Sequence, residues 1–271
     1  MSENVEHIYR DTFLTPEEIA RDAKIREAVR KEFPPAALNS RRDTSKLARM
    51  ALENVIDSIS EIDRECKTLL NGVEHGLVNV NYEFDKNSKH ELLIAKLTSE
   101  KLRQKGWKVP RAETKSGYRY PTAAENHLGS TRKWCDLLVN LDDRDRLWIE
   151  IKLAWKAWFN CVGGPTYSNR NYLPYLQGDN HTHSFRGDLE KLSGPGWGPN
   201  DYRAVCLIGF DCIQQPMDNE VSHVVQPANQ GVAKMSCIWN SMAERHWKDR
   251  RNPDFRINTW CWLLECSRQP A

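Results

Sequence analysis

The 271-residue sequence contains no run of about twenty apolar residues, the length that a membrane-spanning helix requires. Its first residues, 1–6, have neither the basic start nor the apolar stretch of a secretory signal peptide. We therefore expect a cytoplasmic protein with no membrane partner. With 39% apolar and 28% charged residues, the composition is that of a folded globular chain rather than a disordered one.

Cysteine pairs with zinc-site spacing are also missing. Eight cysteines are present, but no two stand in a Cys-x-x-Cys arrangement. In a reducing compartment we expect no disulfide bonds. Cys135, Cys206, Cys261 and Cys266 lie in apolar runs typical of strands, which predicts that they are small core residues.

Excess charge of one sign is absent as well, since the formal net charge is +2 and the pI is about 8.1. This argues against a protein that binds nucleic acid by overall charge alone. A local basic cleft that binds nucleic acid is an alternative interpretation, with Arg132-Lys133 as one candidate. Such clusters more often lie on a solvated surface.

Two apolar segments, residues 134–141 and 147–153, stand on either side of the polar turn 142–146. This pattern predicts an antiparallel hairpin. Because strand side chains alternate between faces, Glu150 and Lys152 should share one face of the second strand. On the first strand, Cys135 should join the apolar row of Leu137, Val139 and Leu141, with Asp136 pointing the opposite way.

A hairpin centred near Asp143 places position 136 opposite position 150. Opposed residues have Cβ atoms about 4.5–5.5 Å apart, where two carboxylates repel unless a cation lies between them. Oxygen ligands suit Mg²⁺, for which Mn²⁺ can substitute, and the carbonyl of Ile151 offers one more ligand. Lys152 would orient the attacking water or stabilise charge on phosphorus. Solvated charges on an exposed hairpin are the alternative interpretation, and a slip of two residues would separate the partners.

Asp136, followed fourteen positions later by Glu150-Ile151-Lys152, resembles the PD-(D/E)XK nuclease superfamily. The resemblance covers roughly residues 88–210, with Cys135 where a proline is usual. It implies an α/β protein with a restriction-endonuclease-like fold, a mixed β-sheet flanked by helices in the order helix, three antiparallel strands, helix, strand.

The resemblance further implies a Mg²⁺-dependent endonuclease that hydrolyses DNA phosphodiester bonds in restriction, another defence role or repair. Asp136, Glu150 and Lys152 would be catalytic, and Asp136, Glu150, Ile151 and Glu91 would surround the metal. The alternative function is a catalytically inactive nucleic-acid-binding or assembly module on the same fold. A preference for DNA or RNA, the strand preference and a homodimer are left open.

Glu91 belongs to a helix that we expect from Ser88 to about Lys105, in a core domain of residues 88–271. Glu100 stands nine positions later and must point to the opposite side, so at most one of the two glutamates faces the site. A capping box with Ser88 also explains Glu91 without a metal. Glu125, in a loop, is the third candidate.

Residues 1–87 are interpreted as an N-terminal helical arm or subdomain, with helices over 15–33 and about 44–71. Within the core, a first strand is expected from Trp107 to about Thr114. An irregular segment over 161–183 could contact DNA, although a disordered insertion explains it equally well. Its DNA-contacting candidates are Tyr167, Arg170 and Tyr172.

The rest of the core is expected to hold a helix over 184–192, a buried strand over 202–210, a helix near 230–246 and a strand over 255–266. Trp260 and Trp262 share one face of the last strand. Core packing or an oligomer interface explains them better than a base-stacking platform.

Overall fold

The computed structural model describes most of the chain from residue 41 onward. The described ranges are 41–65, 68–70, 73–75, 90–112, 117–124, 134–159, 166–168, 172–178, 184–233, 237–249 and 254–266. The helix expected over 15–33 lies outside these ranges. So do Glu125, Arg132, Lys133 and Arg170.

A five-stranded mixed sheet organises the fold, in the order β10-β11-β9-β6-β5. Strand β5 (Leu137–Asn140) pairs antiparallel with β6 (Arg146–Trp155), and β6 pairs parallel with β9 (Asp201–Cys212). Strand β11 (Phe255–Cys266) pairs antiparallel with both β9 and β10 (Cys237–Lys248). The expected α/β class with a mixed sheet is confirmed.

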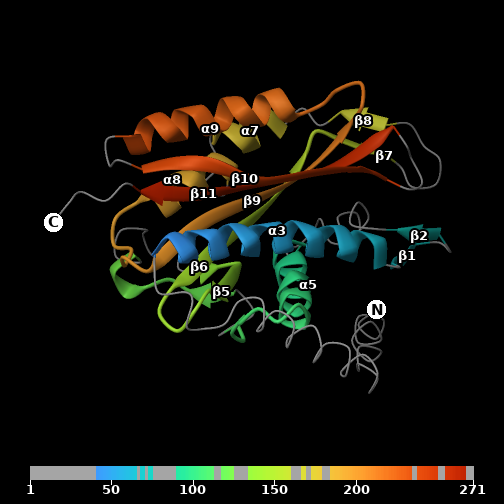
Figure 1. The fold of residues 1–271 in the computed structure, drawn as a ribbon. Coiled ribbons are helices and arrows are strands. Elements are labelled where there is room, and N and C mark those ends of the chain that lie inside the picture. The colour runs from blue at the N-terminus through green and yellow to red at the C-terminus, as the bar shows by residue number, and fades with distance from the viewer. Residues whose placement is uncertain are drawn as a thin grey trace, which may run out of the picture.

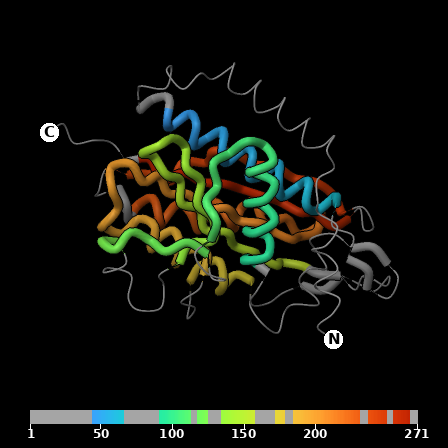
Figure 2. Tube along the Cα trace, turned by 90° about the horizontal axis from the view of Figure 1, so that it is seen from below, coloured from blue at the N-terminus to red at the C-terminus, as the bar shows by residue number. Residues whose placement is uncertain are grey.

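Helices cover both faces of the sheet (Figure 1). Helices α3 (Arg41–Glu65) and α5 (His90–Gln104) lie on one face, where Figure 2 shows them side by side. Helices α7 (Tyr172–Gln177), α8 (Phe185–Ser193) and α9 (Asp218–Ala233) lie on the other. Strand β6 contributes to both cores, because its successive side chains alternate between the two faces.

Helix α3 belongs to the main core. Its apolar stripe, which includes Leu52, Val55 and Ile59, is buried in one cluster with Ile149 and Ile151 of β6. The apolar face of this helix is thus covered by the sheet. The placement of a domain boundary at residue 87 stays a prediction.

The helix expected near 230–246 is wrong in position. Helix α9 ends at Ala233, and residues 237–248 form β10, which pairs along its length with β11. The sequence of β10 contains the helix-forming stretch Met242-Ala243-Glu244-Arg245, but long-range pairing outweighs this local preference. The strand over 255–266 is confirmed, and Trp260 and Trp262 are packed in the core.

Three short two-stranded ladders accompany the main sheet. They are β1 (Thr68–Leu70) with β2 (Val73–His75), β3 (Tyr118–Arg119) with β4 (Trp134–Cys135), and β7 (Ala157–Phe159) with β8 (Thr166–Ser168). In place of the strand expected from Trp107, the described residues contribute a single bridge between Lys108 and Asn140. The segment 161–183 is partly regular, since it holds β8 and α7.

Cys135, Cys206, Cys212 and Cys261 are free and buried, which confirms core thiols at three of the four expected positions. The expectation of no disulfide is wrong for Cys237, which is disulfide-bonded. None of the described helices combines the length and the apolar character needed to cross a membrane.

Candidate active site

The candidate site lies along the edge of β6 that follows Ile149, where β5 no longer pairs with it. The pairs Leu137↔Ile149 and Val139↔Leu147 confirm the expected hairpin register, which sets position 136 level with position 150. The chain bends at Asp136, and the residues before it form β4, which pairs with β3 instead. Strand β5 therefore leaves the following part of the β6 edge uncovered.

Two carboxylates occupy this uncovered edge. Asp136 Oδ2 accepts a hydrogen bond from the backbone N–H of Ile151 at 2.8 Å. Glu91 Oε1, from the first turn of α5, accepts one from the N–H of Leu153 at 3.3 Å. Because these residues are two apart on one strand, their N–H groups lie about 6–7 Å apart along the edge.

The bend also places Cys135 differently from the expectation. Its side chain packs in the cluster of Leu138 and Trp148, on the opposite side of the sheet from Leu137. The alternation breaks because the chain is no longer a regular strand at Asp136. Gly117 supports the bend: its φ is +110°, and a Cβ there would lie 2.1 Å from the carbonyl oxygen of Cys135.

Lys152 lies beside the two edge carboxylates and is almost fully buried. Its Nζ donates a hydrogen bond to Glu91 Oε2 at 2.9 Å and forms an ion pair with Asp188 Oδ2 at 3.2 Å. Burial alone lowers the pKa of Lys152, but Asp188 and Glu91 outweigh this effect and raise it well above the ordinary value. Lys152 is therefore an ammonium group at neutral pH, which favours an electrostatic role over that of a general base.

Helix α8 adds two site residues that the sequence reasoning missed. Lys191 Nζ lies 2.6 Å from Glu150 Oε1 and 2.7 Å from Asp188 Oδ1, and all three residues are buried. Tyr120 also donates a hydrogen bond to Glu150 Oε1. The i,i+3 spacing of Asp188 and Lys191 was the available signal, but such pairs usually lie on a solvated helix face.

Among the described residues, the site holds more negative than positive charge when all its groups are ionised. Its carboxylates are Glu91, Asp136, Glu150 and Asp188, and its ammonium groups are Lys152 and Lys191. Burial raises the pKa of Asp136 to about 6, against a lowering by Lys152. Burial also raises the pKa of Glu150, with Asp188 adding to the effect. A divalent cation would neutralise the excess charge and lower the pKa of Asp136.

The carboxylate oxygens of the site are the kind of ligand that Mg²⁺ prefers. Mg²⁺ takes one or two carboxylates and completes its shell with waters and substrate oxygens, so Asp136 with Glu150 is sufficient. Ile151 presents its backbone to the same edge, because its N–H contacts Asp136. In the described ranges, Glu91, Asp136 and Glu150 do not form a set of three whose ligand atoms all lie within 4.8 Å of one another.

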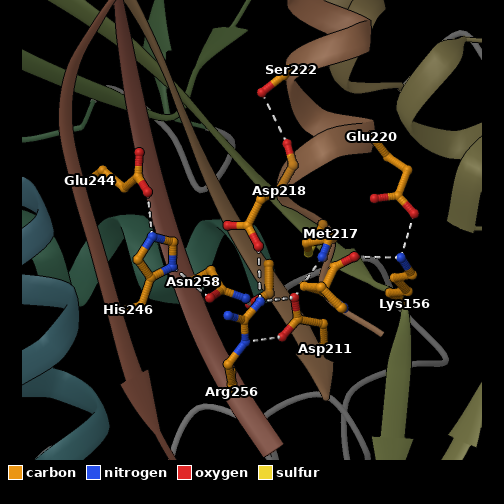
Figure 3. A network of polar contacts seen from close by, with 12 residues as sticks. Lys156, Asp211, Met217, Asp218, Glu220, Ser222, Glu244, His246, Arg256 and Asn258 are labelled. Carbon is orange, nitrogen blue, oxygen red and sulfur yellow. Dashed lines mark hydrogen bonds and ion pairs between the residues drawn. The ribbon is translucent and has the colours of Figure 1, made fainter. Parts of the chain in front are cut away.

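A second group of possible ligands lies at the start of α9. Among the described residues, Asp218, Glu244 and His246 form the set of three whose ligand atoms all lie within 4.8 Å of one another (Figure 3). Arg256 already pairs with Asp218 at 3.1 Å, and Asn258 contacts His246 Nδ1 at 2.7 Å. The Arg256 guanidinium makes this group a poorer cation site than the edge of β6.

Of the two candidate glutamates that the structure describes, Glu91 lies at the site. Tyr175 of α7 also donates a hydrogen bond to Glu91 Oε1, at 3.2 Å. The interpretation of Tyr172 as a DNA contact is wrong, because its side chain is only 4% exposed and packs in the core. Tyr167 lies in β8, and a DNA contact by its side chain stays a prediction.

Comparison with family models, with curated proteins and with solved structures finds no match for this chain.

Proposed function

We propose that this protein is a metal-dependent nuclease that hydrolyses phosphodiester bonds in DNA. The observation that carries the proposal is the hairpin register that sets Asp136 level with Glu150, with the buried ammonium group of Lys152 two residues further along β6. The buried groups Glu150, Asp188, Lys152 and Lys191 balance in charge, and the partly buried carboxylates Asp136 and Glu91 add negative charge beside them. A divalent cation would neutralise this added charge without protonation of either group.

Asp136 and Glu150 would hold Mg²⁺, with the Ile151 carbonyl at the same edge. When bound, the cation would supply a water of lowered pKa and neutralise charge on the phosphodiester. Lys152, protonated and fixed by Glu91 and Asp188, would orient the attacking water and stabilise the negative charge that develops on the phosphoryl oxygens. Glu91 would hold Lys152 in place rather than bind the metal directly.

A restriction-endonuclease-like fold is part of the proposal. The order α5, β5, β6, α8, β9, with β5 and β6 antiparallel and β9 parallel to β6, supports it. The single bridge at Lys108, next to β5, is all that the described residues supply for the first of the three expected antiparallel strands. The site lies where β5 begins, between α5 on one face and α8 on the other.

The test is cleavage of mixed-sequence genomic DNA, supercoiled plasmid and circular single-stranded DNA by the full chain, with Mg²⁺ or Mn²⁺ and with EDTA. We expect metal-dependent cleavage that Lys152→Ala abolishes. Lys108→Ala is the matched control, because it removes an exposed lysine that pairs with Asp143 near the same hairpin. RNA is included as a substrate to decide the nucleic-acid class.

The outcome also separates the proposal from its alternative, a catalytically inactive nucleic-acid-binding or assembly module. Absence of cleavage of every substrate by wild type, with DNA binding retained in a gel-shift assay, would favour that alternative. Cleavage that survives unchanged in Lys152→Ala would show a contaminating nuclease or another site.

A further inference from the structure

The hydrogen bonds from described side chains hold only one of the two carboxylate oxygens of Glu150. The hydrogen bonds that it accepts from the described side chains both end on Oε1, one from Lys191 at 2.6 Å and one from the hydroxyl of Tyr120. Glu150 is 3% exposed and Lys191 is 8% exposed, so these contacts are shielded from bulk water. Within the described part of the chain, Oε2 is the oxygen left for another ligand.

The donors are themselves fixed. Lys191 is anchored by Asp188 Oδ1 at 2.7 Å, and its ammonium lies 5.5 Å from the centre of the Tyr120 ring. Tyr120 packs against Trp148 and Trp197, with ring centroids 5.8 and 5.2 Å away. Both donors therefore reach Glu150 from rigid surroundings.

Asp188 connects this arrangement to Lys152. Its Oδ2 is buried without a hydrogen bond, although the Nζ of Lys152 lies 3.2 Å away. The two lysines thus share one carboxylate, and each also contacts a different glutamate, Glu91 or Glu150. Displacement of Lys191 would therefore change the ion pairs of both Glu150 and Asp188, and through Asp188 that of Lys152.

We infer that Lys191 and Tyr120 are positioning residues that hold Oε1 of Glu150 and so present Oε2 to a divalent cation shared with Asp136. The inference rests on the proposed function. Carboxylates that bind metals are usually oriented by further hydrogen bonds, and loss of such partners weakens metal affinity by about 10- to 100-fold. No contact of Lys191 or Tyr120 with substrate is involved.

A purely structural role of the same residues predicts a different result. If Lys191 only balances buried charge, removal of the Tyr120 hydroxyl leaves the charge balance intact and does not change cation affinity. If the two donors orient Glu150, Tyr120→Phe weakens cation binding although the fold and the charge are preserved. Tyr120→Phe is thus the decisive variant, and it stays informative if Lys191→Met fails to fold.

The experiment is a Mn²⁺ titration of the full chain, followed by the electron paramagnetic resonance signal of free Mn²⁺. The variants are Lys191→Met, Tyr120→Phe and Asp136→Asn. Arg186→Met is the control for a lost cation on α8, where Arg186 forms an exposed pair with Glu190. Tyr118→Phe is the control for a lost hydroxyl, since Tyr118 donates to Pro110 O. Thermal unfolding of each variant reports the fold.

We expect wild type to bind Mn²⁺ at a site that Asp136→Asn removes, and Lys191→Met and Tyr120→Phe to weaken binding by about 10- to 100-fold. The two controls should bind like wild type. Unchanged binding in folded Tyr120→Phe would overturn the inference and leave the proposed function standing. Absence of Asp136-dependent Mn²⁺ binding in wild type would overturn both.

Discussion

The carboxylate of Asp136 accepts a hydrogen bond from the backbone N–H of Ile151 at 2.8 Å. This contact replaces the hydrogen bond that a longer β5 would have made to β6, because β5 pairs only as far as Ile149. The position of the Asp136 side chain is thus fixed by the main chain of β6, and its charge is not needed to hold it there. Geometry and charge at Asp136 can therefore be separated experimentally.

Asp136→Asn tests the need for charge. The amide oxygen of asparagine can still accept from Ile151, so the position is retained while the negative charge is lost. We expect metal-dependent cleavage to fall by about 100-fold or more. Without metal, the free energy of unfolding at neutral pH should rise, because burial disfavours the ionised aspartate.

The matched control for this variant is Asp143→Asn, in the exposed hairpin turn, where the side chain is 92% exposed. Cleavage rates and urea unfolding curves are the measurements. If Asp136→Asn cleaves DNA as fast as wild type, Asp136 is not part of the catalytic site.

Metal-free stability should depend on pH through Asp136. Burial raises its pKa to about 6, above the ordinary value of 3.8. A carboxyl group with a raised pKa in the folded state stabilises the protein while protonated, and this contribution is lost as the pH rises through about 6. We expect a loss of no more than about 3 kcal/mol between about pH 4 and pH 7, measured as wild type minus Asp136→Asn in urea unfolding.

Saturating Mn²⁺ should reverse this trend, because the cation favours the ionised form. Mn²⁺ affinity should accordingly increase as the pH rises through about 6. A difference between wild type and Asp136→Asn that does not vary with pH would contradict the raised pKa.

Lys152→Met should strongly destabilise the protein as well as abolish cleavage. Removal of the ammonium leaves Glu91 and Asp188 without their shared partner in a buried site. Loss of one partner of a buried ion pair costs about 3–5 kcal/mol, to be measured by urea unfolding. Lys108→Met, which breaks the exposed pair with Asp143, should cost about 1 kcal/mol or less.

A double-mutant cycle with Glu91→Gln completes this test. The two substitutions contact the same network, so their effects should be non-additive. Additive effects would mean that Glu91 and Lys152 do not interact in solution.

Gly117→Ala should displace the backbone at Asp136, although the two residues are nineteen positions apart in the sequence. A Cβ at this position would lie 2.1 Å from the carbonyl oxygen of Cys135 and 3.6 Å from Asp136 Cα. The backbone at Asp136 must therefore shift, and we expect weaker Mn²⁺ binding together with a destabilisation of about 1–3 kcal/mol. Calorimetric titration with Mn²⁺ and thermal unfolding measure the two effects.

Gly106→Ala is the control for backbone strain, because Gly106 also has a positive φ, of 90°, at the end of α5. It should lose stability but bind Mn²⁺ normally. Equal effects of both substitutions on Mn²⁺ binding would exclude a specific role for Gly117.

The hairpin could be predicted from the sequence because its signals are local. The alternation of residues 147–153 and the polar turn specify the pairing, and one slip would expose the apolar face. The bend at Asp136 could not be predicted, since it depends on the close approach of Gly117, nineteen positions earlier. Cys135 was accordingly assigned to the wrong face.

Asp188 and Lys191 escaped prediction for a related reason. An acid and a base three positions apart on a short helix are ordinary surface residues. These two are buried because α8 packs over the sheet and pairs them with Lys152 and Glu150 of β6. The misplaced helix near 230–246 has the same origin. The hydrogen bonds that make residues 237–248 a strand come from β11, which follows later in the chain.

The start of β5 at Leu137 has a consequence for how the candidate site tolerates change. Asp136 and Glu91 come from different parts of the chain, yet both are anchored to amides on the same strand, at Ile151 and Leu153. The spacing between the backbone N–H groups of Ile151 and Leu153 thus sets the distance between the two anchored carboxylates. This spacing is fixed by the covalent geometry of β6 rather than by side-chain packing. Substitutions that tilt or slide α5 should stretch the Glu91 anchor before they alter this spacing.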